Sequence, residues 1–121
     1  MKIIIAGGRN FNDYDYLVTS CDSVISSIEL KEGETIEIVC GLAAGADKMG
    51  EAYAESRGYP VKYFPAMWHF FGNSAGYKRN VQMAEYADGL IAFWDGESRG
   101  TMHMINIAKE NNIESIKVFK Y

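Results

Sequence analysis

The chain has few of the residues that mark exported, membrane-spanning or metal-binding proteins. Its two cysteines, Cys21 and Cys40, form no CxxC pair, and its two histidines, His69 and His103, are isolated. No cysteine, histidine or carboxylate cluster has metal-ligand spacing, so we expect no metal site. Isolated thiols are typical of reducing compartments, and the apolar run at 2–6 is too short for a signal peptide, so we expect a cytoplasmic protein. No apolar run reaches membrane-spanning length, and no membrane partner is expected.

The sequence also lacks an excess of positive charge. Its 121 residues include 12 lysines and arginines against 16 acidic residues, for a formal net charge of −4. A protein that binds DNA without sequence preference needs a basic face to release counterions from the phosphates. The balance therefore argues against nucleic acid as the partner. The length and ordinary composition predict one domain over residues 1–121.

Two nucleotide-binding fingerprints are absent. There is no GxxxxGK[ST] sequence, which excludes a P-loop, and the glycines at 7–8 lack the GxGxxG spacing of the dinucleotide-binding turn.

What is present is a regular alternation of two hydrophobic periods. Short apolar runs predict five strands, at 2–6, 35–40, 61–64, 89–94 and 115–120. Helical spacing predicts intervening helices, at about 14–28, 46–57, 78–87 and 101–111. Residues 65–77 fit neither period and are expected to form an aromatic-rich loop. The alternation predicts an α/β fold with a mainly parallel sheet of about five strands and helices on both faces.

Three loops of small and polar residues follow the first, second and fourth predicted strands. They are GGR at 7–9, GLAAGAD at 41–47 and DGESRGT at 95–101. In parallel sheets these loops meet at one edge, beyond the carboxyl ends of the strands. Small residues before a helix leave backbone N–H groups accessible, and a helix N-terminus attracts anions. Glycines at strand ends are also ordinary turn residues, so one such loop alone would say little.

Charged side chains near these loops suit a phosphorylated ligand. Arg9, Arg79 and Arg99 can donate charge-assisted hydrogen bonds to phosphate oxygens. Asp47 and Asp95 can accept hydrogen bonds from ribose hydroxyls or a base amino group. The expected ligand-binding residues are Gly7, Gly8, Arg9, Gly41, Gly45, Asp47, Arg79, Asn80, Asp95, Gly96, Ser98, Gly100 and Thr101.

The aromatic residues allow more than one interpretation. Trp68 and Trp94 could each stack on a base, although Trp94, at a strand end, is better explained by packing. Phe70, Phe71 and Tyr77 could equally form a contact between subunits.

Several stretches together resemble the SLOG superfamily. They are IIIAGGRNFNDY, VCGLAAGADKMGEAYAESRG, AMWHFFGNSAGYKRNVQMAEYADGLIAFWDGESRGT and MINIAK, which span nearly the whole chain in order. Within the superfamily the chain is most similar to the small single-domain proteins related to YspA and YpsA, found in bacteria and phages. The resemblance implies a Rossmann-like three-layer α/β/α fold that binds nucleotides or nucleotide-derived ligands, without a further cofactor.

The Lonely Guy phosphoribohydrolases of the superfamily offer a residue-level comparison. Arg79 matches their catalytic arginine, and Gly96, Gly100 and Thr101 fall in their phosphate loop, which is slightly longer here. Asn80 replaces their lysine, and Met104 occupies the position of their glutamate. A thioether cannot serve as acid or base. The resemblance therefore implies a retained phosphate site without its hydrolytic carboxylate.

Three functional hypotheses follow. The first is a non-catalytic domain that binds a nucleotide-derived small molecule, as a sensor or, in a phage, as a sequestering protein. The second is a nucleotide N-glycosidic hydrolase, in which Arg79 stabilises charge and Asp47 or Asp95 is the carboxylate. The third is single-stranded DNA binding, as in the Smf/DprA DNA-processing relatives. Homo-oligomers are expected for all three, since the aromatic segment 67–77 offers apolar surface.

Overall fold

One parallel sheet forms the centre of the computed structural model, which describes residues 1–41 and 45–121. The described part of the chain contributes five strands to the sheet in the order β3-β2-β1-β4-β5. They are β1 (Lys2–Gly7), β2 (Glu37–Cys40), β3 (Val61–Tyr63), β4 (Gly89–Trp94) and β5 (Ser115–Lys120). Every neighbouring pair is parallel, which confirms the predicted sheet.

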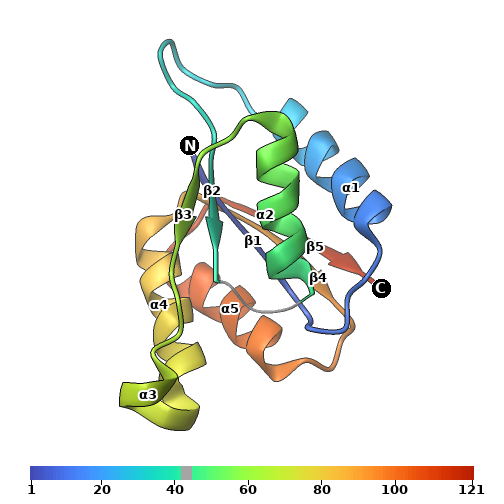
Figure 1. Ribbon diagram of the computed structural model, residues 1–121. Helices are drawn as coiled ribbons and strands as arrows, with labels where there is room; N and C mark the ends of the chain where they lie inside the picture. Colours follow the sequence, from blue (N-terminus) through green and yellow to red (C-terminus); the bar gives the residue numbers. More distant parts are fainter. Residues whose placement is uncertain (42–44) are drawn as a thin grey trace.

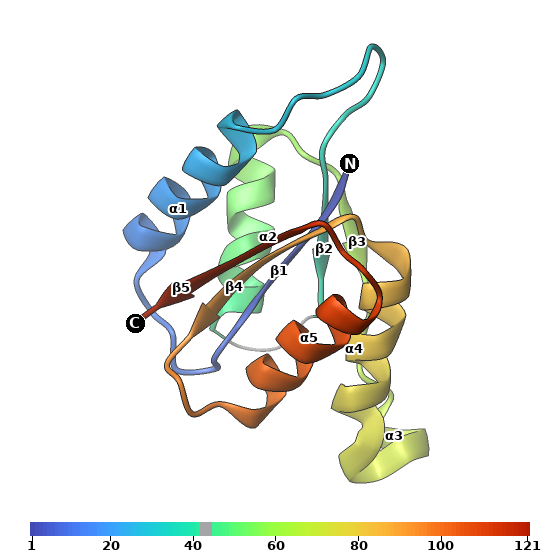
Figure 2. The ribbon, with the colours of Figure 1, turned by 180° about the vertical axis from the view of Figure 1, so that it is seen from behind.

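Helices cover both faces of the sheet and complete a Rossmann-like three-layer α/β/α fold (Figures 1 and 2). α1 (Tyr14–Ser26) and α2 (Ala46–Arg57) pack on one face, and α4 (Ala75–Tyr86) and α5 (Arg99–Glu110) pack on the other. A short helix α3 (Trp68–Phe71) and a 3₁₀ turn at Gly72–Ser74 precede α4 and project from one end of the molecule (Figure 1). Within the described residues, no helix is long and apolar enough to cross a bilayer.

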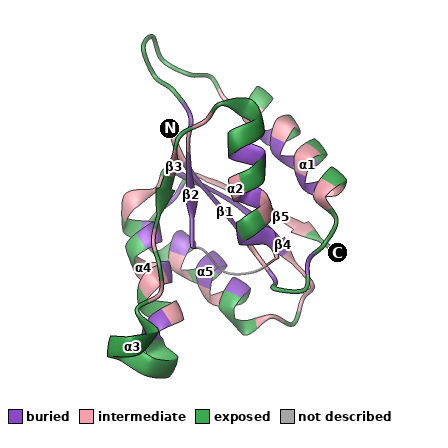
Figure 3. Cartoon of the chain, in the orientation of Figure 1, coloured by how far each residue is buried: buried purple, intermediate pink, exposed green. Residues whose placement is uncertain are grey.

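The first strand shows why the sheet is covered on both sides. Ile3, Ile4 and Ile5 are each at most 1% exposed. Ile3 and Ile5 face α1 and α2, whereas Ile4 faces α4 and α5. Side chains alternate across a strand, so an unbroken apolar run requires apolar partners on both faces. Figure 3 shows buried residues concentrated on the strands and on the inner faces of the helices.

The packing of α1 against α2 includes a polar contact that the sequence pattern did not indicate. Asp22 lies on the partly exposed face of α1. Its carboxylate accepts hydrogen bonds from the Tyr53 hydroxyl (2.6 Å) and from Arg57 Nη2 (2.7 Å) on α2. A periodicity argument places a residue on a helix face but does not see the neighbouring helix.

Several predicted boundaries differ from the observed ones by about one to three residues. The second strand begins at Glu37 instead of residue 35, and the last helix begins at Arg99 instead of residue 101. The segment 65–77, expected to be irregular, contains α3, the 3₁₀ turn and the start of α4. Part of the expected loop at 41–47, residues 42–44, lies outside the described residues.

Candidate functional site

A cavity of about 450 Å³ opens at the carboxyl ends of β1 and β4. The chain leaves β1 toward the face of α1 and leaves β4 toward the face of α5, so the two following loops diverge here. Such a switch point is where open parallel sheets bind their ligands. The start of α5 and the loop after β1 line the cavity, together with α4 and the α3 segment.

Most of the residues expected at the site line this cavity. They are Gly7, Gly8, Arg9, Asp47, Arg79, Asn80, Ser98, Gly100 and Thr101. Gly41, Gly45, Asp95 and Gly96 were also expected there but are absent from the described lining. Gly45 supports the loop after β1 from outside, where a Cβ would lie 2.6 Å from the Arg9 carbonyl oxygen.

The N-terminus of α5 forms one end of the cavity. Ser98 caps the helix: its hydroxyl accepts from the Thr101 backbone N–H at 3.4 Å and lies 3.1 Å from the Thr101 hydroxyl. The first N–H groups of any helix lack intrahelical acceptors and carry partial positive charge. A Cβ on Gly100 would meet nothing within 4 Å, so the backbone is open at this point. This end of the cavity suits an anion.

The glycines after β1 have a different role from the expected one. The Gly8 N–H donates to the Phe93 carbonyl at 3.2 Å, so it is not free to bind phosphate as the sequence suggested. At Gly7 a Cβ would lie 2.6 Å from the Phe93 oxygen and 2.7 Å from the Ala46 Cβ. Gly7 is glycine because β4 and α2 approach it closely, whereas a Cβ on Gly8 would overlap the Tyr121 hydroxyl. The loop lines the cavity, but its glycines serve packing.

Arg79 is the half-buried cation of the site. Its Nη1 donates to the Gly41 carbonyl and its Nε donates to Asn80 Oδ1 at 3.2 Å. Burial lowers the pKa of Arg79, the negative charge of Asp47 opposes that shift, and the positive charge of Arg9 adds to it. A guanidinium keeps its charge in proteins, so two repelling cations remain at this cavity. An anionic ligand would relieve their repulsion.

Asp47 is the carboxylate among the described residues that line the cavity. It is 6% exposed and lies in the first turn of α2, where the helix dipole stabilises a negative charge. A Cβ on Gly41 would lie 2.9 Å from Asp47 Oδ2 and would also overlap the Arg79 guanidinium. Asp47 and Arg79 therefore converge beside Gly41. The cavity carries two positive charges and one negative charge in a protein whose net charge is −4.

Asn80 connects the two helices of the site. It is 6% exposed, and its amide nitrogen lies 3.2 Å from the Gly100 carbonyl oxygen and 3.1 Å from His103 Nδ1. Its amide oxygen accepts from Arg79 Nε. Both amide hydrogens are thus committed to the protein, and one oxygen lone pair is left. Asn80 was expected to contact ligand, but its contacts make it a positioning residue for Arg79 and for the start of α5.

His103 completes this network from α5. Burial lowers its pKa, and the negative charge of Glu110 opposes that shift. A neutral imidazole suits the contact, because Nδ1 must accept from the Asn80 amide. The Tyr77 ring packs edge-on against the imidazole, with 4.6 Å between the ring centroids.

Asp95 and Trp94 belong to the loop structure and not to the cavity. Asp95 Oδ1 accepts from the backbone N–H groups of Glu97 (2.9 Å) and Ser98 (2.8 Å). These two hydrogen bonds hold the pKa of Asp95 below its usual range. Trp94 Nε1 donates to the Ser98 carbonyl at 3.1 Å, and Lys120 lies over its ring. Both side chains shape the turn that leads into α5, so neither is placed to read a ligand in this cavity.

The sequence pattern missed part of the lining. Asn10, Asn73 and Gly76 were not singled out, and Tyr77 was considered only for a subunit contact; all four line the cavity. Gly76 and Tyr77 were missed because α4 begins at Ala75 and not at residue 78, so residues expected in a loop form one side of the cavity. Tyr121 was missed as well. Its hydroxyl donates to Asn10 Oδ1 at 2.8 Å and holds the loop after β1 in place.

Met104 lines the cavity where the Lonely Guy enzymes carry glutamate, and it is buried together with Met83. Within the described residues, no three His, Cys, Asp or Glu side chains gather as a metal site would require. Cys40 is no better placed for chemistry. Burial raises its pKa to about 12, so the thiol stays protonated at neutral pH.

Comparison with known proteins identifies the family of the chain. No curated protein and no solved structure gives a match. A family model described as the YspA, cpYpsA-related SLOG family matches residues 1–71, which is more than half of the chain. The match runs from β1 through α3 and includes the loop after β1 and the start of α2. The chain therefore belongs to the YspA and cpYpsA-related SLOG family.

Proposed function

We propose that this chain is a single ligand-binding domain over residues 1–121 that binds a nucleotide or nucleotide-derived small molecule, as a sensor or a sequestering protein. Membership of the SLOG family supports the general part of this proposal, which is binding or processing of a nucleotide-related ligand. The phosphate would lie against the first turn of α5, with Arg79 and Arg9 neutralising its charge.

One observation carries the proposal: two arginines and a helix N-terminus face one cavity whose inner wall is formed by methionines. Arg9, Arg79 and Gly100 supply the positive potential, while Met83 and Met104 line the same space. Two guanidinium groups against a single carboxylate favour a bound anion. The methionines offer no proton transfer, which favours binding over hydrolysis.

A thermal-shift screen tests the proposal. The purified protein is heated with nucleoside monophosphates, cyclic nucleotides and ADP-ribose, and the recovered ligand is identified by mass spectrometry. We expect a raised Tm with the ligand recovered intact, because a ligand that binds only the folded state stabilises it. Arg79→Ala should abolish the shift, whereas Lys48→Ala on the exposed face of α2 should retain it. The absence of any shift across the panel would count against a small-molecule function.

A second candidate function is nucleotide N-glycosidic hydrolysis. Asp47 favours it, since this buried carboxylate lines the cavity close to the Arg79 guanidinium. In that reaction the carboxylate would stabilise the positive charge that develops on the ribose ring or activate the attacking water. Asp95, the other carboxylate considered, is occupied by the turn before α5.

The same mass spectra separate the two functions. Hydrolysis would return the free base and ribose phosphate in place of the intact nucleotide. Asp47→Asn should then remove turnover while the thermal shift persists, because the amide keeps the shape but not the charge. Intact ligand in every sample would leave binding as the function.

The proposal includes a cytoplasmic, homo-oligomeric protein. Cys21 and Cys40 are both unpaired, as suits a reducing compartment. Apolar side chains of the α3 segment, including Met67, Phe70 and Phe71, are exposed on the single chain and would be covered by a second copy.

A further inference from the structure

We propose that Trp68 stacks on the base of the ligand, so that this site selects phosphates that carry a base over simple sugar phosphates. The inference rests on the proposed function and names the part of the ligand that the aromatic end of the cavity recognises. Neither family membership nor the phosphate end of the site assigns a role to this residue.

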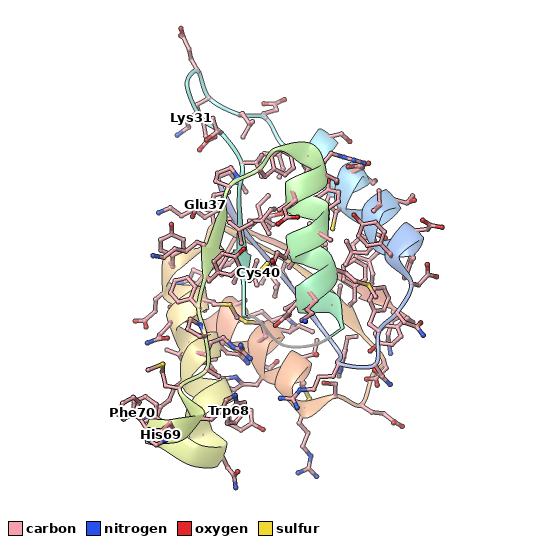
Figure 4. All side chains as sticks on the ribbon, viewed as in Figure 1. Lys31, Glu37, Cys40, Trp68, His69 and Phe70 are labelled. Atoms are coloured by element: carbon pink, nitrogen blue, oxygen red, sulfur yellow. The ribbon has the colours of Figure 1, made fainter. Side chains whose placement is uncertain are left out.

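Trp68 is exposed to the cavity and not simply to solvent. Its side chain is 49% exposed, and it is among the residues that line the cavity. Phe70, two residues later, is 72% exposed and does not line it. Residues two apart on a helix point in nearly opposite directions, and Figure 4 shows Trp68 and Phe70 on opposite sides of α3. The orientation of α3 therefore places the Trp68 side chain, and not that of Phe70, in the lining of the cavity.

The indole is held in place by α4. A Cβ on Gly76 would lie 3.4 Å from Trp68 Cη2 and 3.9 Å from Cζ2, so the six-membered ring rests near the α4 backbone. An aromatic ring held by packing loses little entropy when a ligand stacks on it. Trp68 is thus prepared as a stacking surface before any ligand binds.

The cavity has a different chemistry at each end. The start of α5 presents backbone N–H groups and the loop after β1 presents Arg9, whereas the segment before α4 presents Trp68 and the amide of Asn73. Gly76 and Arg79 lie one turn apart on α4, a separation of about 5 Å along the helix. A molecule with an anionic group at one end and a flat ring at the other matches both ends. A sugar phosphate would reach only the first.

Stacking on Trp68 should make the site select ligands that carry a base over ligands that lack one. Every base has a π face, so an indole prefers a base over no base but discriminates weakly among bases. The amide of Asn73 can both donate and accept hydrogen bonds and is the group placed to contact a base edge.

Two ligands and three variants test the inference by calorimetry. Adenosine 5′-monophosphate carries a base and ribose 5-phosphate does not, so the ratio of their dissociation constants isolates the base. We expect the wild type to favour the nucleotide by about tenfold or more. Trp68→Ala should remove most of that preference and leave ribose 5-phosphate binding unchanged. Trp68→Phe should keep much of it, and the matched control Phe70→Ala should keep all of it.

The outcomes separate this inference from the function beneath it. If both ligands bind the wild type and Trp68→Ala leaves their ratio unchanged, Trp68 does not recognise the base, while the phosphate site stands. If neither ligand binds the wild type and the nucleotide panel gives no thermal shift, the proposed function fails and the inference falls with it. Circular dichroism on each variant confirms that a lost preference reflects recognition and not unfolding.

Discussion

Asn80 is the residue on which the geometry of the site depends most. It orients Arg79 with its amide oxygen and places the first turn of α5 through Gly100 and His103. Asn80→Ala should lower the free energy of unfolding by about 1–3 kcal/mol, because buried polar groups lose their partners. It should also weaken nucleotide binding. Urea unfolding and calorimetry measure the two effects, with Gln82→Ala on the exposed face of α4 as the control. Wild-type affinity in Asn80→Ala would show that Arg79 needs no such support.

His103 makes the stability of the domain depend on pH at the same place. Burial lowers its pKa below the ordinary value of 6.5, so between the two values the unfolded chain binds more protons than the folded one. The contribution of His103 to stability is therefore complete above pH 6.5 and declines as the pH falls toward the folded pKa.

His103→Gln isolates this effect. The variant cannot titrate, so its unfolding midpoint should change less between pH 7.5 and pH 5 than that of the wild type. The carboxylates Asp22 and Asp95, whose pKa values are lowered, lose their contributions only at more acidic pH, below about 4. Urea midpoints measured at both pH values for both proteins check the prediction. Equal changes would place the sensitivity elsewhere.

At the scale of elements, a substitution in the first turn of α5 should change ligand binding without lowering the stability of the fold. A methyl group on Gly100 enters open space, and alanine favours a helix over glycine by up to about 1 kcal/mol. Gly100→Ala should therefore leave the unfolding midpoint unchanged or slightly raised, yet reduce phosphate binding, because the methyl projects where the ligand lies. Gly7→Ala, whose methyl would meet the Phe93 carbonyl and Ala46, should destabilise the fold instead. Unfolding curves with and without adenosine 5′-monophosphate distinguish the two variants. A destabilised Gly100→Ala would contradict this account of α5.

The elements also show what sequence reasoning could reach. The apolar run at 2–6 and the helical stripes predicted the parallel sheet and both helical layers, because burial on two faces leaves a direct mark on the residue pattern. The predicted topology also placed the loops after β1 and β4 at the same edge of the sheet. The hydrogen bond from the Gly8 N–H to the Phe93 carbonyl of β4 could not be predicted, nor could those that the Asp95 carboxylate accepts within its own turn, since hydrophobic periodicity does not encode such hydrogen bonds. Nor could the position of Trp68, because α3 is too short to have a readable period, or that of Tyr77, because α4 begins at Ala75 and not at residue 78.

For the whole molecule, the net charge is negative, whereas the described lining of the cavity carries more positive than negative charge. A net charge of −4 repels polyanions, while Arg9 and Arg79 attract a small anion into a confined space. The arrangement favours a small phosphorylated ligand over single-stranded DNA, whose many phosphates would need a long basic path.

We expect the exposed apolar residues around α3 to mediate self-association. Met67, Phe70 and Phe71 are exposed on a segment that projects from the body of the molecule (Figure 1), and apolar side chains gathered in this way mark interaction surfaces. We expect sedimentation velocity to show a species larger than the 13.5 kDa chain at micromolar concentration. Phe70→Ser should shift it toward the monomer, because it removes the most exposed of these rings. Leu30→Ser, at a similarly apolar exposed position in a distant loop, should not. A wild-type chain that sediments as a monomer at all concentrations would show that this surface serves some purpose other than self-association.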